Sequence, residues 1–210
     1  MPVNVFADVP EQEFRQAGRR RKFARDEVVF HESDPGDCLH RVATGRFAAR
    51  ITTPLGDVAT FSVMGPGEVF GLLAVLHPDS RRTATVIALQ PSETFVIPTS
   101  AFLRLRSAHP AVSVAIEQVL VEMLTASSNR LVEALYTPAH LRVRARLRDL
   151  ARIYGDGSGA PVTIPLTQED LAGLAGTTRE TVNRVLQDEQ QRGSVTLARR
   201  RITISPDTLR

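Results

Sequence analysis

The stretch from Pro110 to Thr137 contains no glycine and, after its first residue, no proline. Proline is tolerated in the first turn of a helix and ends a helix elsewhere, so Pro138 marks the far end of one long helix. Apolar residues recur along this stretch at the spacing of one helix face. They are Ile116, Val119, Leu120, Met123, Leu124, Leu131 and Leu135. This helix divides the chain into a part before it, the helix itself and a part after it.

A helix of this length needs a surface that covers its apolar stripe. A parallel copy of the same helix would provide that surface, so the stripe predicts a homodimer. The alternative is that the helix packs on the sheet of its own domain. Ser127 and Ser128 interrupt the stripe, and both arrangements stay open.

The part before the helix consists of short apolar runs separated by turns that are rich in Asp, Pro and Gly. The runs cover residues 28–30, 39–42, 47–51, 58–63, 83–87 and 94–97. Strands at this spacing are typical of an antiparallel sandwich or barrel. The basic run Arg19–Lys22 precedes the first strand and reads as a solvated basic turn, with a nucleic-acid patch as the alternative.

The part after the helix contains two short helical segments joined by a tight turn. Thr167 precedes three polar residues, two of them acidic, which is a good N-cap for the first segment. Residues 176–178 (Gly-Thr-Thr) then break the helix, and a second segment runs from Arg179 to Gln191. Two short helices joined by a three-residue turn with a glycine form a helix-turn-helix.

The second of these segments carries the side chains that read DNA. Thr178 precedes the segment, and Arg179, Glu180, Asn183 and Arg184 are predicted to face outward near its start. Arginine pairs with guanine O6 and N7, and a carboxylate accepts a hydrogen bond from cytosine N4, so this helix suits a major groove. The alternative is a helical hairpin whose arginine face is only solvated.

Two short apolar runs near the C-terminus predict a β-hairpin wing. They cover residues 195–197 and 202–204 and flank three consecutive arginines, Arg199, Arg200 and Arg201. Arginines at the tip of such a hairpin are suited to contact DNA phosphates.

The distribution of charge agrees with an anionic partner for the C-terminal part. Residues 138–210 carry 12 basic and 8 acidic side chains, a net charge of +4, whereas the rest of the chain has a net charge of −1. Lys22 is the only lysine, so the other basic residues are arginines that stay protonated at any ordinary pH. A basic C-terminal part of this kind favours nucleic acid as the partner.

Composition also excludes several classes of protein. Cys38 is the only cysteine, so one subunit holds no disulfide and no cysteine-rich zinc or iron–sulfur site. The five histidines contain no His-x-His pair, so we expect no metal site and no metalloenzyme. We also expect that the protein is not an enzyme of another kind. No apolar run of about 18 residues and no secretory signal are visible, so we expect a cytoplasmic protein without a membrane span or membrane partner.

Together these motifs resemble the CRP/FNR transcription regulators, the family of the cyclic-AMP receptor protein, over nearly the whole chain. The most specific segment is residues 177–184 (TTRETVNR), which is similar to the recognition-helix signature Ser-Arg-Glu-Thr-Val followed by Arg. The resemblance implies an α+β fold with an N-terminal antiparallel β-roll effector domain (1–109), a dimerisation helix (110–137) and a C-terminal winged helix-turn-helix domain (138–210).

The resemblance also implies how this protein acts. Arg179, Glu180 and Arg184 would read a half-site of the TGTGA type, and a homodimer would bind a pseudo-palindromic site on double-stranded DNA. RNA polymerase would be a further partner. The family also has iron–sulfur and haem-binding members. A cluster is excluded by the single cysteine, and haem ligation by His77 is disfavoured because no cysteine neighbours it.

Residues 65–71 and 82–85 resemble the family's phosphate-binding cassette. In relatives that bind cyclic AMP, an arginine pairs with the cyclic phosphate and a hydroxyl residue adds a hydrogen bond. Arg82 and Thr83 match these two positions. Gly71 matches the glycine of the Gly-Glu pair near the start of the cassette.

The cassette departs from the family at one position. Leu72 stands where relatives have the glutamate that holds the ribose hydroxyl, and an alkyl chain accepts no hydrogen bond. Ser127 and Ser128 fall where relatives place the Thr-Ser pair that contacts adenine. The resemblance therefore implies a cyclic-nucleotide-like pocket in which cyclic AMP binds weakly or not at all. A glutamate at position 72 would be expected to strengthen that binding.

Two other functions stay open. The first is an effector-independent family member that is controlled by its abundance. The second is a small-molecule-binding β-barrel protein that does not act on DNA and uses its C-terminal part only to dimerise.

Overall fold

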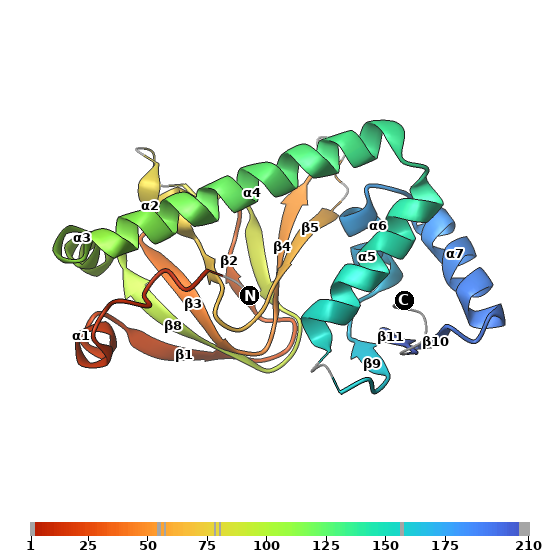
Figure 1. Cartoon of the computed structure of the whole chain (residues 1–210), viewed down its shortest axis with the longest axis horizontal. Helices are drawn as coiled ribbons and strands as arrows, with labels where there is room; N and C mark the ends of the chain where they lie inside the picture. The colour runs from red at the N-terminus through yellow and green to blue at the C-terminus, as the bar shows by residue number, and fades with distance from the viewer. Residues whose placement is uncertain are drawn as a thin grey trace. The chain divides into compact units, whose positions relative to one another are not determined.

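The structure is a computed structural model that describes residues 3–53, 56, 58–77, 79, 81–155 and 158–205 (Figure 1). The chain forms two compact units. The N-terminal unit contains Met1–Ile51 and Ser62–Ser128, and the C-terminal unit contains Thr52–Phe61 and Asn129–Arg210. The predicted order of antiparallel sheets, long helix and helix-turn-helix is confirmed.

Two four-stranded sheets make up the β-roll. The first has the strand order β1-β8-β3-β6 and the second β2-β7-β4-β5. The strands are β1 (Arg19–Phe23), β2 (Val28–Phe30), β3 (Cys38–Thr44), β4 (Phe47–Thr52), β5 (Val58–Met64), β6 (Val69–Phe70), β7 (Thr85–Ala88) and β8 (Ser92–Pro98). Leu39 of β3 pairs with Ile97 of β8, and both are fully buried. Burying such aliphatic side chains stabilises the roll by roughly 1.5–3 kcal/mol each.

The expectation of a basic turn at residues 19–22 is wrong. These residues belong to strand β1, which pairs with β8 in antiparallel register, for example Arg20 with Phe95. The strand lies at the edge of its sheet, and its first four residues are exposed. Exposed charged side chains are usual on edge strands because they discourage pairing with another chain. Such a strand has no apolar alternation from which it could be predicted.

Short helices complete the N-terminal unit. They are α1 (Glu11–Gln16), α2 (Leu72–Leu76) and α3 (Thr99–Ala108), and the long helix α4 (Pro110–Tyr136) follows. Phe6, Phe14 and Phe102 belong to one buried cluster with Val112 and Ile116 of α4. The first turns of α4 therefore pack on the N-terminal unit, as one of the two sequence hypotheses proposed.

The remaining length of α4 is largely exposed. Leu124 is 70% exposed, Leu131 62% and Leu135 66%. By length and composition alone, α4 is also long and apolar enough to cross a membrane. The sequence predicts no such helix, because no uninterrupted run of about 18 apolar residues is present. An exposed apolar stripe of this size equally marks a protein–protein interface.

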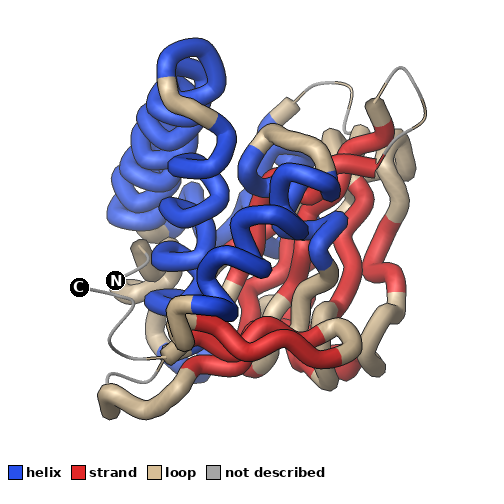
Figure 2. The backbone as a smooth tube through the Cα atoms, turned by 90° about the vertical axis from the view of Figure 1, so that its right-hand side faces the viewer, coloured by secondary structure: helices blue, strands red, loops and turns tan. Residues whose placement is uncertain are grey.

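The C-terminal unit combines three helices with a small sheet. Its elements are α5 (Ala139–Tyr154), β9 (Val162–Ile164), α6 (Gln168–Ala175), α7 (Arg179–Gln191), β10 (Val195–Ala198) and β11 (Arg201–Ile204). The strands pair in the order β10-β11-β9, and Figure 2 shows them in red beside the blue helices that they contact. Leu147, Leu171 and Leu186 lie in the core between the helices. The predicted helix-turn-helix and wing are present, and β9 is a strand that the sequence did not reveal.

Candidate nucleic-acid interface and effector pocket

Local hydrogen bonds fix where helix α6 begins. The Thr167 hydroxyl accepts a hydrogen bond from the Asp170 backbone N–H at 3.1 Å, and the Asp170 carboxylate accepts one from the Thr167 N–H at 3.0 Å. This reciprocal arrangement is a capping box, with aspartate in place of the usual glutamate. Thr167 therefore has the capping role that its position in the sequence predicts.

The turn between α6 and α7 is set by a glycine and a threonine. Gly176 adopts a left-handed conformation with φ of 58°, which a residue with a Cβ rarely does. Thr178 caps α7 by accepting a hydrogen bond from the Thr181 N–H at 3.4 Å. Gly176 therefore ends α6 and Thr178 begins α7.

Helix α7 has one buried face and one exposed face. Val182 and Leu186 are fully buried, whereas Arg179, Glu180 and Arg184 are exposed. Hydrogen bonds from its own backbone N–H and from Thr178, with the charge of Arg179, lower the pKa of Glu180. The start of α7 therefore presents two cations and one ionised carboxylate to the solvent.

Asn183 lies differently from the other side chains of the predicted interface. It is half-buried, and its amide oxygen lies 3.5 Å from Gln168 Nε2 of α6. The sequence did not indicate Gln168, because the contact joins residues 15 positions apart on two helices.

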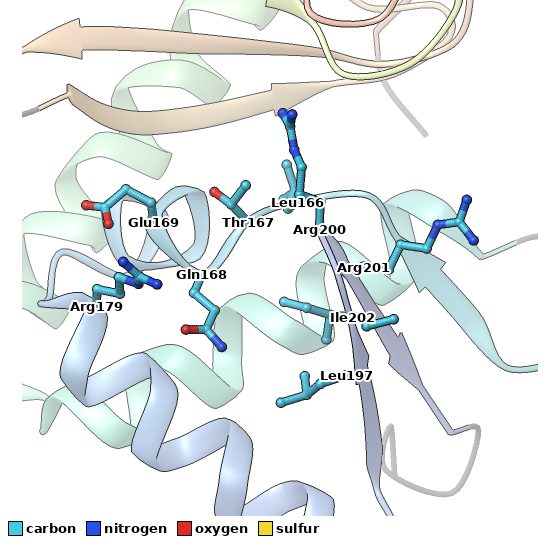
Figure 3. A pocket seen from close by; sticks show the side chains of 10 residues that line it. Leu166, Thr167, Gln168, Glu169, Arg179, Leu197, Arg200, Arg201 and Ile202 are labelled. Carbon is cyan, nitrogen blue, oxygen red and sulfur yellow. The ribbon is translucent and has the colours of Figure 1, made fainter.

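A cavity of about 420 Å³ lies between the start of α6, the start of α7 and the wing (Figure 3). Gln168, Arg179, Arg200 and Arg201 are among the residues that line it. Arg199, Arg200 and Arg201 are exposed at the turn of the hairpin, where Arg200 has a positive φ of 56°. Three arginines and one carboxylate, that of Glu169, are among its lining residues, so the charged side chains of the lining have a net positive charge.

The cassette residue Gly71 is required for a steric reason. It begins α2 with φ of 82°, and a Cβ there would lie 2.6 Å from Arg82 Nη1. Leu72 follows it and is only 3% exposed, because it belongs to the hydrophobic cluster of Phe102 and Ile116. The Leu72 side chain is thus a core residue in this structure.

Arg82 is buried, and its guanidinium contacts the chain itself. Nη1 donates to the Cys38 carbonyl at 2.7 Å, and Nη2 lies 3.3 Å from both Asp37 Oδ1 and Cys38 Sγ. The guanidinium also stacks 4.1 Å above the Phe30 ring. Its Nε has no hydrogen-bond partner among the described residues. Asp37 is 83% exposed, so little negative charge is buried with this cation.

The other three residues of the predicted effector site are accessible. Thr83 is exposed beside Arg82. Ser127 and Ser128 are exposed on α4.

The histidine and cysteine of β3 are part of the packing of the β-roll. His40 stacks on Phe70 at 4.8 Å, and burial lowers its pKa to about 3, so its ring is neutral. Burial raises the pKa of the Cys38 thiol. His77 lies on the surface after α2, where its Nδ1 accepts a hydrogen bond from the Asp79 N–H. In the part of the chain that the structure describes, no three His, Cys, Asp or Glu side chains are grouped to hold a metal ion.

Two family models match this chain. The cyclic nucleotide-binding domain matches residues 20–109, and the Crp-like helix-turn-helix domain matches residues 141–210. Among the relatives is the CRP-like cAMP-activated global transcriptional regulator of Mycobacterium tuberculosis. It is 31% identical over 87% of this chain and 82% of its own length. The cyclic AMP receptor protein of Thermus thermophilus is 30% identical over 85% of this chain and 80% of its own length.

Solved structures share the fold. FixK2 of Bradyrhizobium japonicum superimposes with a TM-score of 0.78 at 19% identity, over 91% of this chain and 95% of its own. The catabolite activator protein of Thermus thermophilus has a TM-score of 0.56 at 28% identity, over 98% and 95% of the two chains.

The fold and the two matched domains define a DNA-binding transcription regulator with a cyclic nucleotide-binding domain. The mycobacterial relative described above, which matches most of the chain, is named a transcriptional regulator and not an enzyme. The chain belongs to the CRP/FNR family.

Proposed function

We propose that this regulator binds a pseudo-palindromic DNA site as a homodimer. The observation that carries the proposal is the exposed start of α7, where Arg179, Glu180 and Arg184 lie together above a buried face. Each α7 would enter a major groove and read a TGTGA-type half-site, and two half-sites would lie about one helical turn apart. Arg199 and Arg201 of the wing would contact the flanking phosphates.

The exposed stripe of α4 supports the homodimer. Leu124, Leu131 and Leu135 remain uncovered in the single chain, and a second α4 would bury them. We propose the domain functions that the sequence predicts. Residues 1–109 form the effector domain, residues 110–137 the dimerisation helix and residues 138–210 the DNA-binding domain.

Arg82 supports an anionic effector. A guanidinium with little buried counter-charge and one unused Nε gains more from a bound phosphate than an exposed one does. To bind it, Arg82 would exchange its contact with the Cys38 carbonyl for the ligand, with Thr83, Ser127 and Ser128 in reach of a cyclic nucleotide. Leu72 provides no acceptor for a ribose, so cyclic AMP would bind weakly or not at all.

By family membership we further propose RNA polymerase as a protein partner and the cytoplasm as the location. The mycobacterial and Thermus relatives are named for activation by cAMP and for binding it, respectively. An effector-free regulator that is controlled by its abundance is the second candidate, favoured by the closed contacts of Arg82 within its own chain.

A gel-shift experiment tests the proposal. The protein is titrated onto a palindrome with two TGTGA half-sites and onto scrambled DNA, each with and without cyclic AMP. A preference for the palindrome that does not depend on cyclic AMP is the expected result. Equal binding to both DNAs would contradict the proposed site, and a preference that requires cyclic AMP would contradict the proposed effector behaviour.

A further inference from the structure

Helix α5 carries an arginine whose side chain donates hydrogen bonds to four backbone carbonyls of the described residues. Arg142 Nε donates to the Ala175 carbonyl at 2.8 Å, and Nη2 donates to the Gly176 carbonyl at 2.7 Å. Nη1 donates to the Thr137 carbonyl at 2.6 Å and reaches the Ala134 carbonyl at 3.5 Å. All these residues lie in the C-terminal unit.

The four carbonyls belong to the ends of two helices. Ala134 and Thr137 mark the end of α4, while Ala175 and Gly176 lie at the turn before α7. The last carbonyls of a helix lack helical partners and carry partial negative charge, so a cation stabilises them. The planar fork of arginine presents donors in several directions at once, and one side chain can therefore join two helix ends. A lysine ammonium has its donors on a single nitrogen atom, so it joins the carbonyls of two helix ends poorly.

Neighbouring arginines of α5 hold the same elements at other points. Arg144 pairs with Glu189 of α7 at 2.8 Å, and Glu189 is only 6% exposed. Arg146 pairs with Glu133 in the last turn of α4, also at 2.8 Å. Helix α7 is thus held to α5 near both its ends, and the last turn of α4 is held to α5 by Arg142 and Arg146.

We propose that Arg142 is a positioning residue that makes the placement of α7 depend on the conformation of the last turn of α4. Arg142 is half-buried and its hydrogen bonds are used by the protein backbone, so it acts through the turn rather than on DNA. A change at the end of α4 moves the Thr137 carbonyl, and the shared guanidinium transmits that change to Gly176 and so to the start of α7. The inference rests on the DNA recognition proposed above.

A double-mutant cycle tests this coupling. The variants are Arg142→Gln, Glu133→Gln and the combination, and the readout is the affinity for the palindrome divided by that for scrambled DNA. Glu133→Gln perturbs the last turn of α4 without touching Arg142. Arg148→Gln is the matched control, since it removes the same charge from an exposed position of α5.

Arg142→Gln should lower the affinity ratio roughly tenfold, because it removes charge-assisted hydrogen bonds that hold the turn. Glu133→Gln should lower the ratio in the wild-type and Arg148→Gln backgrounds and have no further effect in the Arg142→Gln background. Independent effects of Arg142→Gln and Glu133→Gln would overturn the inference, since Arg142 would then be only a local cap.

Arg142→Lys keeps the test decisive if Arg142→Gln fails to fold. This variant retains the charge and the helix propensity but not the fork, so it should keep the thermal unfolding midpoint near that of the wild type and still lose the preference. An Arg142→Lys variant that keeps both its unfolding midpoint and its preference for the palindrome would overturn this inference but not the proposed function. A wild-type protein without any preference would overturn the proposed function and this inference together.

Discussion

At the scale of single residues, the side chains proposed to read DNA differ from the proposed effector residue in burial. Arg179 and Arg184 are exposed at the start of α7. Arg82 is the opposite case, since its guanidinium is buried and its contacts are internal. Substitutions of Arg179 or Arg184 should therefore change DNA recognition, whereas substitution of Arg82 should change ligand binding.

Replacing Arg179 or Arg184 with alanine should reduce sequence discrimination and leave stability almost unchanged. Each bidentate contact with guanine is worth about 1–3 kcal/mol of discrimination. Competition binding with single base-pair changes in the half-site measures the loss, and Arg148→Ala on α5 is the control. A variant that still prefers the palindrome as strongly as the wild type would contradict the assignment of α7.

Leu72→Glu should destabilise the protein rather than simply improve its pocket. Leu72 is packed against Phe102 and Ile116, so a carboxylate there would be buried without a partner, at a cost on the order of 3 kcal/mol. Leu72→Met conserves the volume and should cost below about 1.5 kcal/mol. Chemical denaturation of the two variants measures the difference. Equal stability would show that a carboxylate at position 72 is not buried in the core, which is what stronger cyclic-AMP binding by Leu72→Glu would require.

The buried ring of His40 should make the stability of the protein dependent on pH. Its pKa of about 3 in the folded state lies below the ordinary value of 6.5, so the folded state favours the neutral ring. Stability from this group is present above pH 6.5 and is lost as the pH falls towards 3, by up to about 5 kcal/mol. Urea denaturation across this range should show a flatter profile for His40→Asn than for the exposed control His77→Asn. Parallel profiles would argue against a buried neutral His40.

At the scale of elements, the sequence predicted the helices and strands that are marked by apolar periodicity or by capping residues at their own ends. Pro110 and Pro138 bound the long helix, and Thr167 and Gly176 bound α6, so both could be read directly. Strand β1 could not, because an exposed edge strand carries no apolar alternation. The contacts of Arg82 were also inaccessible, since they join residues 44 and 45 positions apart.

Charges placed on the exposed part of α4 should separate the proposed dimer without unfolding the chain. Leu124→Asp with Leu131→Asp changes two side chains that are 70% and 62% exposed, whereas Leu120 packs partly against the N-terminal core and is a poorer choice. Burying such unpaired charges in a dimer costs several kcal/mol, so sedimentation should show monomers. Gln118→Asp introduces a carboxylate outside the stripe and is the control. A stable dimer of the double variant would show that another surface holds the two chains together.

At the scale of the whole molecule, the proposed effector domain and the C-terminal DNA-binding domain differ in net charge. Residues 138–210 have a net charge of +4 and the rest of the chain −1, so attraction to DNA is concentrated in the C-terminal part. We expect any effector control of that attraction to act through Arg82 in the other part of the chain. A titration with cyclic AMP tests whether ligand binding at Arg82 changes the affinity of the C-terminal part for DNA.

Cyclic AMP should bind weakly and leave DNA affinity nearly unchanged. Arg82 already donates to the Cys38 carbonyl, and with Leu72 in the core the ribose hydroxyl would lack its acceptor. An unmade buried hydrogen bond costs about 1–3 kcal/mol, which weakens binding roughly 5- to 150-fold relative to a pocket that supplies it. Calorimetry of the wild type measures the affinity. Arg82→Ala should abolish any residual binding, whereas the exposed neighbour Arg81→Ala should retain it. Tight, stoichiometric binding coupled to a large gain in DNA affinity would instead show that Arg82 leaves its internal contacts for the ligand.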